Sequence, residues 1–289
     1  MSSASTAVQI HYRRMLESDL RAVHLLTQVV CWPHRREDCE LLYRLGRGFV
    51  AECDRGVIGT ALWWAHGDDL ASLGMVIVLP EAQGRGIGSE LMNRLLEEIG
   101  ERNTLLNATP RGQPLYERLG FRVIGKAHKH QGTVAPHAPV VPPPGTRLRA
   151  IEARDGTALV ELASSAAGMP RASVMDELLR IAEGVVIEDG NSNPVGFAIL
   201  RRFGHGDAIG PVVAPDPGHA RALVSHLAAA RTGSFMRIDV RDESELDSLL
   251  SELGLAQVVD DTQIVMVRGE APQADPGMHQ FAIVSHALF

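Results

Sequence analysis

Residues 74–99 read GMVIVLPEAQGRGIGSELMNRLLEEI, and this stretch decides the fold. Residues 75–79 form a short apolar run rich in β-branched side chains, and the run ends at Pro80, which predicts a buried strand. After Gly86, apolar residues recur at helical spacing: Ile87, Leu91, Met92, Leu95, Leu96 and Ile99. The stretch therefore predicts a strand, a glycine-rich loop and a helix, in that order.

The glycines of this loop suit the binding of an anion. A helix start presents unpaired backbone N–H groups and the positive end of the helix dipole, and only residues without side chains let a phosphate come close. A Walker loop is excluded because Ser89-Glu90 stands where Lys-Ser/Thr is needed, and Ser89 also takes the place of the third Rossmann glycine. The loop predicts a pyrophosphate cradle, and a tight turn without a ligand is the alternative.

Two motifs carry a resemblance to a known family. Gln83-x-x-Gly86-x-Gly88 resembles the Q/R-x-x-G-x-G/A pyrophosphate loop of the GNAT (Gcn5-related N-acetyltransferase) superfamily, whose members use acyl-CoA. Further along the chain, residues 115–121 (LYERLGF) are similar to the L-Y-x-x-x-G-F segment of that superfamily. The two motifs in this order make the resemblance specific for the fold and the cofactor, and leave the substrate open.

The resemblance implies roles for named residues, with acetyl-CoA as co-substrate and no metal. Tyr116 would be the general acid that protonates the departing thiolate, although a tyrosine packed on the core is the other interpretation. Backbone groups of Val76 and Val78 would pair with the pantetheine arm, and Thr109 stands where the family often has an asparagine. The pyrophosphate would be held by the loop residues Gln83, Gly84, Arg85, Gly86, Ile87, Gly88 and Ser89.

Candidate acceptor contacts lie before the loop. In the family pattern, two helices, expected after residue 17 and over residues 36–45, form a wall of the acceptor site, so Trp32 and His34 between them become candidates. Glu52 is a further substrate candidate. The alternatives are a tryptophan packed under a loop, a solvated histidine and a strand-end glutamate. No general base stands out, and the options are Glu52, Glu81, His34 and His66.

The second part of the sequence repeats the first. Gly59, Pro80 and Gly120 have counterparts at Gly196, Pro215 and Gly254, with offsets of 137, 135 and 134 residues, which indicates an internal duplication. At these offsets the places of Gly86 and Gly88 fall near Arg221 and Leu223, and Leu250 takes the place of Tyr116. We expect the second copy to keep the fold without the cofactor site. It would cover the acceptor cleft, support the first copy, or be a purely structural repeat.

We therefore expect an α+β protein with two tandem GNAT-like domains, each a mixed, mostly antiparallel sheet flanked by helices. The predicted parts are a GNAT N-acetyltransferase domain over residues 1–130, a proline-rich linker over 131–146 and a degenerate domain over 147–289. The linker composition already begins near residue 127, after a strand predicted over residues 121–124. In the tail, residues 281–284 predict a strand that packs on a sheet edge.

Composition restricts the protein class. The chain has 289 residues, 45% of them hydrophobic, which is enough for two folded domains. A net charge of -7 argues against a general nucleic-acid binder, and three cysteines without C-x-x-C spacing suit a reducing compartment. Without a signal-type segment or a membrane-length apolar run, the chain is expected in the cytoplasm with no membrane or nucleic-acid partner. The histidine spacings do not predict a zinc site, and a homodimer is a further expectation.

The expected function is transfer of an acetyl group from acetyl-CoA to a primary amine of a small molecule, by direct attack of the amine. We favour a small acceptor because a cleft partly walled by a second domain suits a compact molecule better than a folded protein surface. The alternatives are protein lysine or N-terminal acetylation, and a non-catalytic CoA-sensing or scaffold protein.

Overall fold

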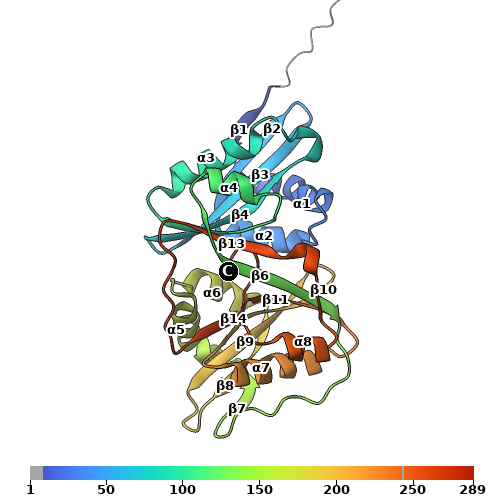
Figure 1. Ribbon diagram of the computed structural model, residues 1–289, viewed down its shortest axis with the longest axis vertical. Coiled ribbons are helices and arrows are strands. Elements are labelled where there is room, and N and C mark those ends of the chain that lie inside the picture. The colour runs from blue at the N-terminus through green and yellow to red at the C-terminus, as the bar shows by residue number, and fades with distance from the viewer. Residues whose placement is uncertain (1–8, 243) are drawn as a thin grey trace, which may run out of the picture. The chain divides into compact units, whose positions relative to one another are not determined.

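The computed structural model describes residues 9–242 and 244–289, and the chain divides into two compact units (Figure 1). The first unit comprises residues 1–64 and 73–101, and the second comprises residues 65–72 and 102–289. The units do not follow the sequence repeat, because strands from the first half of the sequence belong to the second unit. The predicted boundaries at residues 130 and 147 stay predictions about the repeat.

The first unit contains a sheet and three helices. The strand order is β1-β2-β3-β4, with β1 antiparallel to β2 and β2 antiparallel to β3. The ends of β3 and β4 nearest their connection belong to the second unit. The elements are β1 (His11–Arg14), α1 (Leu20–Val29), α2 (Arg36–Leu45), β2 (Arg47–Cys53), β3 (Gly56–His66), β4 (Leu70–Val78) and α3 (Ile87–Ile99), with short 3-10 turns η1 (Glu17–Asp19) and η2 (Pro80–Ala82).

Tight packing joins α2 to β3. Trp63 and Trp64 are both buried, and the indole Nε1 of Trp64 donates a hydrogen bond of 2.9 Å to the carbonyl of Leu42 in α2. A Cβ at Gly46 would lie only 2.4 Å from that indole nitrogen, so only glycine lets the chain turn from α2 into β2 so closely against Trp64. The Trp64 ring therefore packs closely against the end of the helix that was predicted over residues 36–45.

An ion-pair triangle locks the start of each repeat. Arg13 donates to Asp19 at 2.7 Å and to Glu52 at 2.6 Å, and Asp19 also accepts from the backbone N–H of Leu16. Three side chains on matching elements of the second half form the same triangle: Arg149, Asp155 and Glu188. Because the contacts recur, the duplication read from the sequence extends to side-chain geometry.

The second unit contains most of the strands. Their order is β5-β13-β6-β11-β14-β10-β9-β8-β7, with β12 beside β6; β10 and β11 pair in parallel, and the other described pairings in this unit are antiparallel. The strands are β5 (Asn103–Ala108), β6 (Arg122–Thr133), β7 (Arg147–Ala150), β8 (Glu183–Glu188), β9 (Pro194–Phe203), β10 (Gly206–Ala214), β11 (Phe235–Arg241), β12 (Ala256–Gln257), β13 (Gln263–Arg268) and β14 (His279–Ala282).

Helices of the second unit cover this sheet. Alanine and leucine side chains of α7 pack against β8, β9 and β10, and with β11 and α8 they build the main core cluster. The helices are α4 (Gln113–Arg118), α5 (Gly156–Ala167), α6 (Ala172–Ile181), α7 (Pro217–Ala229) and α8 (Asp247–Glu252), with 3-10 turns η3 (Ala153–Asp155) and η4 (Val259–Asp261). Within the described residues, no helix combines the length and apolar character needed to cross a bilayer.

Strand β6 corrects the predicted linker. We expected a strand over residues 121–124 and linker from residue 127 or 131, but β6 continues to Thr133. Residues 127–133 pair in register with residues 235–241 of β11. The partner lies more than a hundred residues further along the chain, so no local pattern marks this segment as a strand. The linker then runs from Val134 to Thr146, where the proline-rich composition excludes regular structure.

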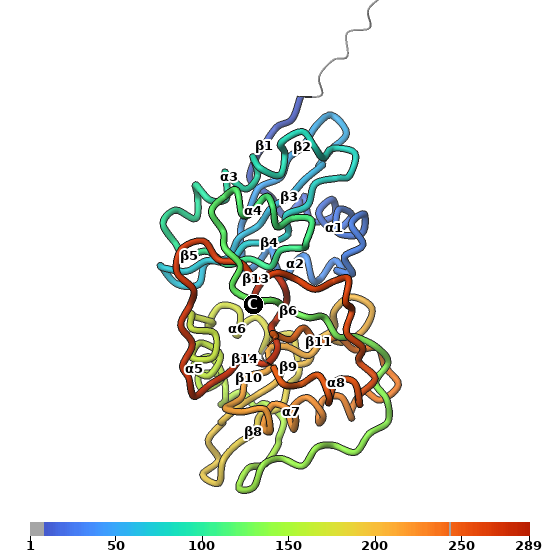
Figure 2. Tube along the Cα trace, viewed as in Figure 1, coloured from blue at the N-terminus to red at the C-terminus, as the bar shows by residue number. Residues whose placement is uncertain are grey.

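The last strands lie inside the sheet rather than at its edge. Strand β13 lies between β5 and β6, and β14 lies between β10 and β11, as the red trace in Figure 2 lets the reader follow. The expectation of an edge position for residues 281–284 is therefore wrong. Beyond the pairing at Ile209 and Ile238, β10 and β11 part, and β14 fills the opening between them.

Candidate active site

The glycine loop has the predicted form of strand, loop and helix. β4 ends at Val78, and α3 begins at Ile87. Gly84 and Gly86 have φ angles of +76° and +77°, a left-handed conformation that costs other residues about 1 kcal/mol or more. A Cβ at either position would meet no atom within 4 Å. The backbone conformation therefore requires glycine, and the space above both residues is open.

Donors gather at this end of α3. The N–H of Glu90 bonds to the carbonyl of Gly86, so the three preceding N–H groups, from Ile87 to Ser89, have no partner within the helix. The Gln83 side chain bonds the carbonyl of Val78 at 3.0 Å and ties the loop to the end of β4. Residues 83–86 are exposed. The predicted loop residues thus form one open cradle of main-chain donors, which suits a diphosphate.

Strand β4 is irregular just before the loop. Met75 has a φ of +53° although it is neither glycine nor asparagine. After it, Val76 and Val78 are half-buried while Ile77 is buried. The second half has a register shift in β10 at the matching place, between Ile209 and Val212. Irregular strand positions are common beside functional sites, and this one alters the course of β4 at the residues predicted to meet the pantetheine arm.

Tyr116 and Thr109 lie in the second unit. Tyr116 is buried on α4, with its ring edge-to-face to Phe121, and burial raises the pKa of the phenol, which stays protonated at neutral pH. Gly112 allows this packing, since a Cβ there would lie 3.2 Å from the tyrosine ring. The Thr109 hydroxyl accepts the N–H of Gly112 at 3.2 Å and still has a proton to donate.

The candidate substrate contacts of the first unit, Trp32, His34 and Glu52, make different contacts in the structure. Trp32 and His34 are neighbours in the connection between α1 and α2, with ring centroids 6.0 Å apart, and His24 donates to the His34 carbonyl. Glu52 belongs to the triangle with Arg13 described above, which the second half repeats at Glu188. A structural role therefore accounts for Glu52, and its part in substrate binding stays a prediction.

His66 does not have the surroundings of an exposed base. It is buried in the second unit, and its Nε2 bonds the hydroxyl of Ser72 at 2.9 Å. Burial, with the charge of Arg171 as a smaller cause, lowers the pKa of His66 to about 3. The imidazole is therefore neutral and serves as a donor to Ser72.

The second half lacks the loop itself, which corrects the predicted counterparts. Residues 79–86 separate β4 from α3, but only residues 215 and 216 separate β10 from α7. Arg221 and Leu223 lie inside α7, and Leu223 is part of the core. The sequence offsets did not take into account that the connection between β10 and α7 is shorter than the one between β4 and α3. At the start of α7, the Asp216 carboxylate accepts the N–H of His219 at 3.0 Å, so a negative side chain occupies the place of an anion.

Leu250 is the structural counterpart of Tyr116. The N–H of Phe121 bonds the carbonyl of Tyr116 at 3.0 Å, and the N–H of Leu255 bonds that of Leu250 at 2.8 Å. A glycine with positive φ lies between donor and acceptor in both halves, at residues 120 and 254. The geometry agrees with the counterpart read from the sequence, and the leucine offers no proton.

Comparison with protein families agrees with this arrangement. Residues 44–123 match a family model described as an acetyltransferase (GNAT) domain, and residues 159–282 match a second model with the same description. The chain belongs to the GNAT superfamily of acetyl-CoA-dependent N-acetyltransferases and carries two GNAT domains in tandem. The α+β class and the tandem organisation predicted from the sequence are thereby confirmed.

Three proteins match this chain over most of its length and most of their own. An uncharacterized N-acetyltransferase of Bacillus subtilis (strain 168), YitH, is 28% identical over 262 residues, covering 89% of this chain and 90% of its own. A putative acetyltransferase from Pyrococcus horikoshii superposes with a TM-score of 0.76 at 19% identity, covering 96% and 95% of the two chains. A tandem GNAT protein from the clavulanic acid pathway gives 0.63 at 12% identity, covering 91% and 100%. The structural likenesses support the fold.

Proposed function

We propose that this N-acetyltransferase moves the acetyl group of acetyl-CoA to a primary amine of a small molecule and uses the first GNAT domain for the reaction. The observation that carries the proposal is the open start of α3, where Gly84 and Gly86 take left-handed conformations, are exposed, and leave space beside the first turn of the helix. The start of α7 in the second domain carries Asp216 instead. An anionic cofactor is therefore assigned to the first domain alone.

Each step of the transfer has a proposed residue. When bound, acetyl-CoA supplies an acetyl thioester. The N–H groups at the start of α3 hold its diphosphate, and backbone groups of Val76 and Val78 align the pantetheine arm. The neutral amine attacks the thioester carbonyl carbon, the carbon–sulfur bond breaks, and Tyr116 gives its phenolic proton to the departing sulfur. The proton released by the amine passes to water, which then restores the phenol. The raised pKa of Tyr116 suits an acid that is protonated before the reaction.

The acceptor class is tested with an amine library that includes small amines, lysine peptides and peptide amino termini, with release of free CoA as the readout. Turnover with small amines supports the proposal, and turnover confined to peptides would replace it with protein acetylation. If acetyl-CoA binds and no amine in the library reacts, a CoA-sensing role is favoured instead.

The first prediction concerns Tyr116→Phe. Loss of the phenolic proton should lower kcat by about 100-fold or more, because general acid catalysis contributes on that scale. The Kd for acetyl-CoA should stay within about twofold, since the hydroxyl acts on the departing sulfur. Steady-state kinetics and calorimetric titration measure the two quantities. Unchanged kcat would contradict the role of Tyr116 as the acid.

A further inference from the structure

The last residues of the chain, Ile283–Phe289, form a buried segment within the second unit, which we call the carboxy-terminal segment. Four side chains donate hydrogen bonds to its backbone carbonyls. Arg201 reaches Val284 at 3.2 Å, Asn107 reaches His286 at 2.9 Å, Ser72 reaches Ala287 at 3.0 Å, and Arg171 reaches Leu288 at 2.7 Å and Phe289 at 2.8 Å. Within the described residues, these carbonyls have no partner strand. Side chains from distant parts of the sequence supply their hydrogen bonds instead.

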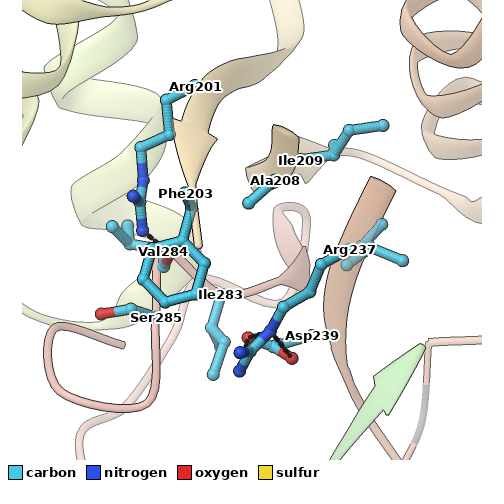
Figure 3. Close-up of a pocket in the computed structure, with 10 residues that line it drawn as sticks. Arg201, Phe203, Ala208, Ile209, Arg237, Asp239, Ile283, Val284 and Ser285 are labelled. Atoms are coloured by element: carbon cyan, nitrogen blue, oxygen red, sulfur yellow. Dashed lines mark hydrogen bonds and ion pairs between the residues drawn. The ribbon is translucent and has the colours of Figure 1, made fainter. Parts of the chain in front are cut away.

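The second GNAT domain holds one side of this segment. Arg171, in the connection between α5 and α6, is almost completely buried, and burial lowers its pKa to about 10, so it stays charged at neutral pH. Arg201 points from β9 to Val284 (Figure 3). In the same view, Arg237 of β11 pairs with Asp239, whose carbonyl accepts the N–H of Ile283 at 2.9 Å.

Two strands of the first GNAT domain hold the other side. Ser72 lies on β4 and Asn107 on β5. The Ser72 hydroxyl accepts a hydrogen bond from His66 and donates one to the Ala287 carbonyl. The same strand continues to Val76 and Val78, and β5 leads directly to Thr109. The segment therefore contacts the strands that carry the proposed cofactor contacts.

We propose that the carboxy-terminal segment is a positioning element for acetyl transfer. Arg171 and Arg201 fix it in the second domain, and its carbonyls fix Ser72 on β4 and Asn107 on β5. Acyl transfer depends on strand positions held within a fraction of an ångström, and a displacement of about 1 Å can cost about 100-fold in rate. The second domain thereby acts on the reaction without binding acetyl-CoA. This inference rests on the proposed function of the first domain.

The test is Arg171→Met, which keeps the side-chain volume and removes both donors to Leu288 and Phe289. Hydrogen exchange should accelerate in peptides covering residues 283–289, 70–78 and 103–109. With the acceptor found in the amine screen, kcat should fall about tenfold or more while KM for that amine changes less. Arg171→Lys retains one donor and should recover part of kcat. Asn107→Leu, which removes the donor on β5, should lower kcat in the same direction.

Arg149→Met is the matched control. It removes another arginine of the second domain, one that binds Asp155 and Glu188 and makes no described hydrogen bond to the carboxy-terminal segment. Its thermal midpoint should fall, but exchange in β4 and β5 and the kcat should remain close to wild type. The comparison separates loss of positioning from general loss of stability.

The inference is overturned if Arg171→Met speeds exchange in residues 283–289 but leaves β4, β5 and kcat as they are in Arg149→Met. If Arg171→Met does not fold, hydrogen exchange in β4 and β5 and the kcat of Arg171→Lys and Asn107→Leu test the inference instead. If the wild-type protein acetylates no amine, the proposed function fails, and the exchange of β4 and β5 still shows whether the segment holds these strands.

Discussion

The residues at the start of α3 and of α7 differ in a way that bears on the proposed anion site. Gly86 at the start of α3 leaves backbone donors open, whereas Asp216 at the start of α7 bonds the first-turn N–H of His219 with its own carboxylate. A carboxylate there stabilises the helix by about 1 kcal/mol, and it repels a diphosphate. The first domain thus lacks a stabilising side-chain cap at this helix end, where we propose that the diphosphate binds.

His66 predicts an acid-sensitive fold. The folded-state pKa of about 3 lies below the value of 6.5 for an exposed histidine, so the unfolded chain binds the proton first as the pH falls. The stability that depends on neutral His66 is fully present above pH 6.5 and is lost between pH 6.5 and 3. At pH 5 this loss is roughly 2 kcal/mol relative to pH 8.

The measurement is urea unfolding at pH 8 and pH 5 for wild type and His66→Gln, which keeps a donor for Ser72. The free energy of unfolding should fall less between pH 8 and pH 5 in the variant than in wild type, by roughly 2 kcal/mol. An equal drop in both proteins would show that His66 does not carry the proton linkage.

Helices and strands differ in how far they could be read from the sequence. The helix predicted over residues 36–45 has those bounds, because its apolar spacing and the glycine that follows are local signals. Strand β6 was predicted far too short, since its second part is a strand only because β11 lies beside it. The absence of a cofactor loop in the second domain was expected, but the places of Gly86 and Gly88 were put near Arg221 and Leu223, which lie inside α7 because only residues 215 and 216 separate β10 from this helix.

Aspartate substitutions at the two ends of helix α3 test the cofactor site. Gly86 and Gly100 lie just before and after the helix, both have positive φ, and a Cβ at either meets no atom within 4 Å. Gly86→Asp places a carboxylate where the second domain has Asp216 and should weaken acetyl-CoA binding by about tenfold or more. Gly100→Asp adds the same carboxylate at the other end of the helix, where ψ is -135° rather than 2° and the backbone strain is larger, and it should still bind as wild type does.

Calorimetric titration with acetyl-CoA measures both affinities, and thermal unfolding without ligand measures how much stability each variant has lost. Equal loss of affinity in both variants would point to destabilisation of α3 rather than to a lost anion site.

At the scale of the whole molecule, two GNAT domains occur in one chain, and we assign the cofactor to one of them. The second domain has no loop, carries Asp216 at the helix start, and has β14 between β10 and β11. In the first domain the strand matching β10 is the one expected to pair with the pantetheine arm. If that expectation holds, β14 would occupy in the second domain the place that a pantetheine arm would take.

We therefore predict one acetyl-CoA site per chain. Titration of the full-length protein should give a stoichiometry of one, and Gly86→Asp should remove this binding without revealing a second site. A stoichiometry of two, or full binding in that variant, would show that the second domain also holds the cofactor.

The sequence by itself determined the strand–glycine loop–helix unit, the tyrosine helix and the tandem repeat, because turns, helix periods and glycine positions are set by neighbouring residues. Only the tertiary structure decided the length of β6, the inward positions of β13 and β14, and the partners of Glu52, His66 and Arg171. Those features depend on contacts between residues far apart in the chain, and neither their pairing nor their burial has a local signal.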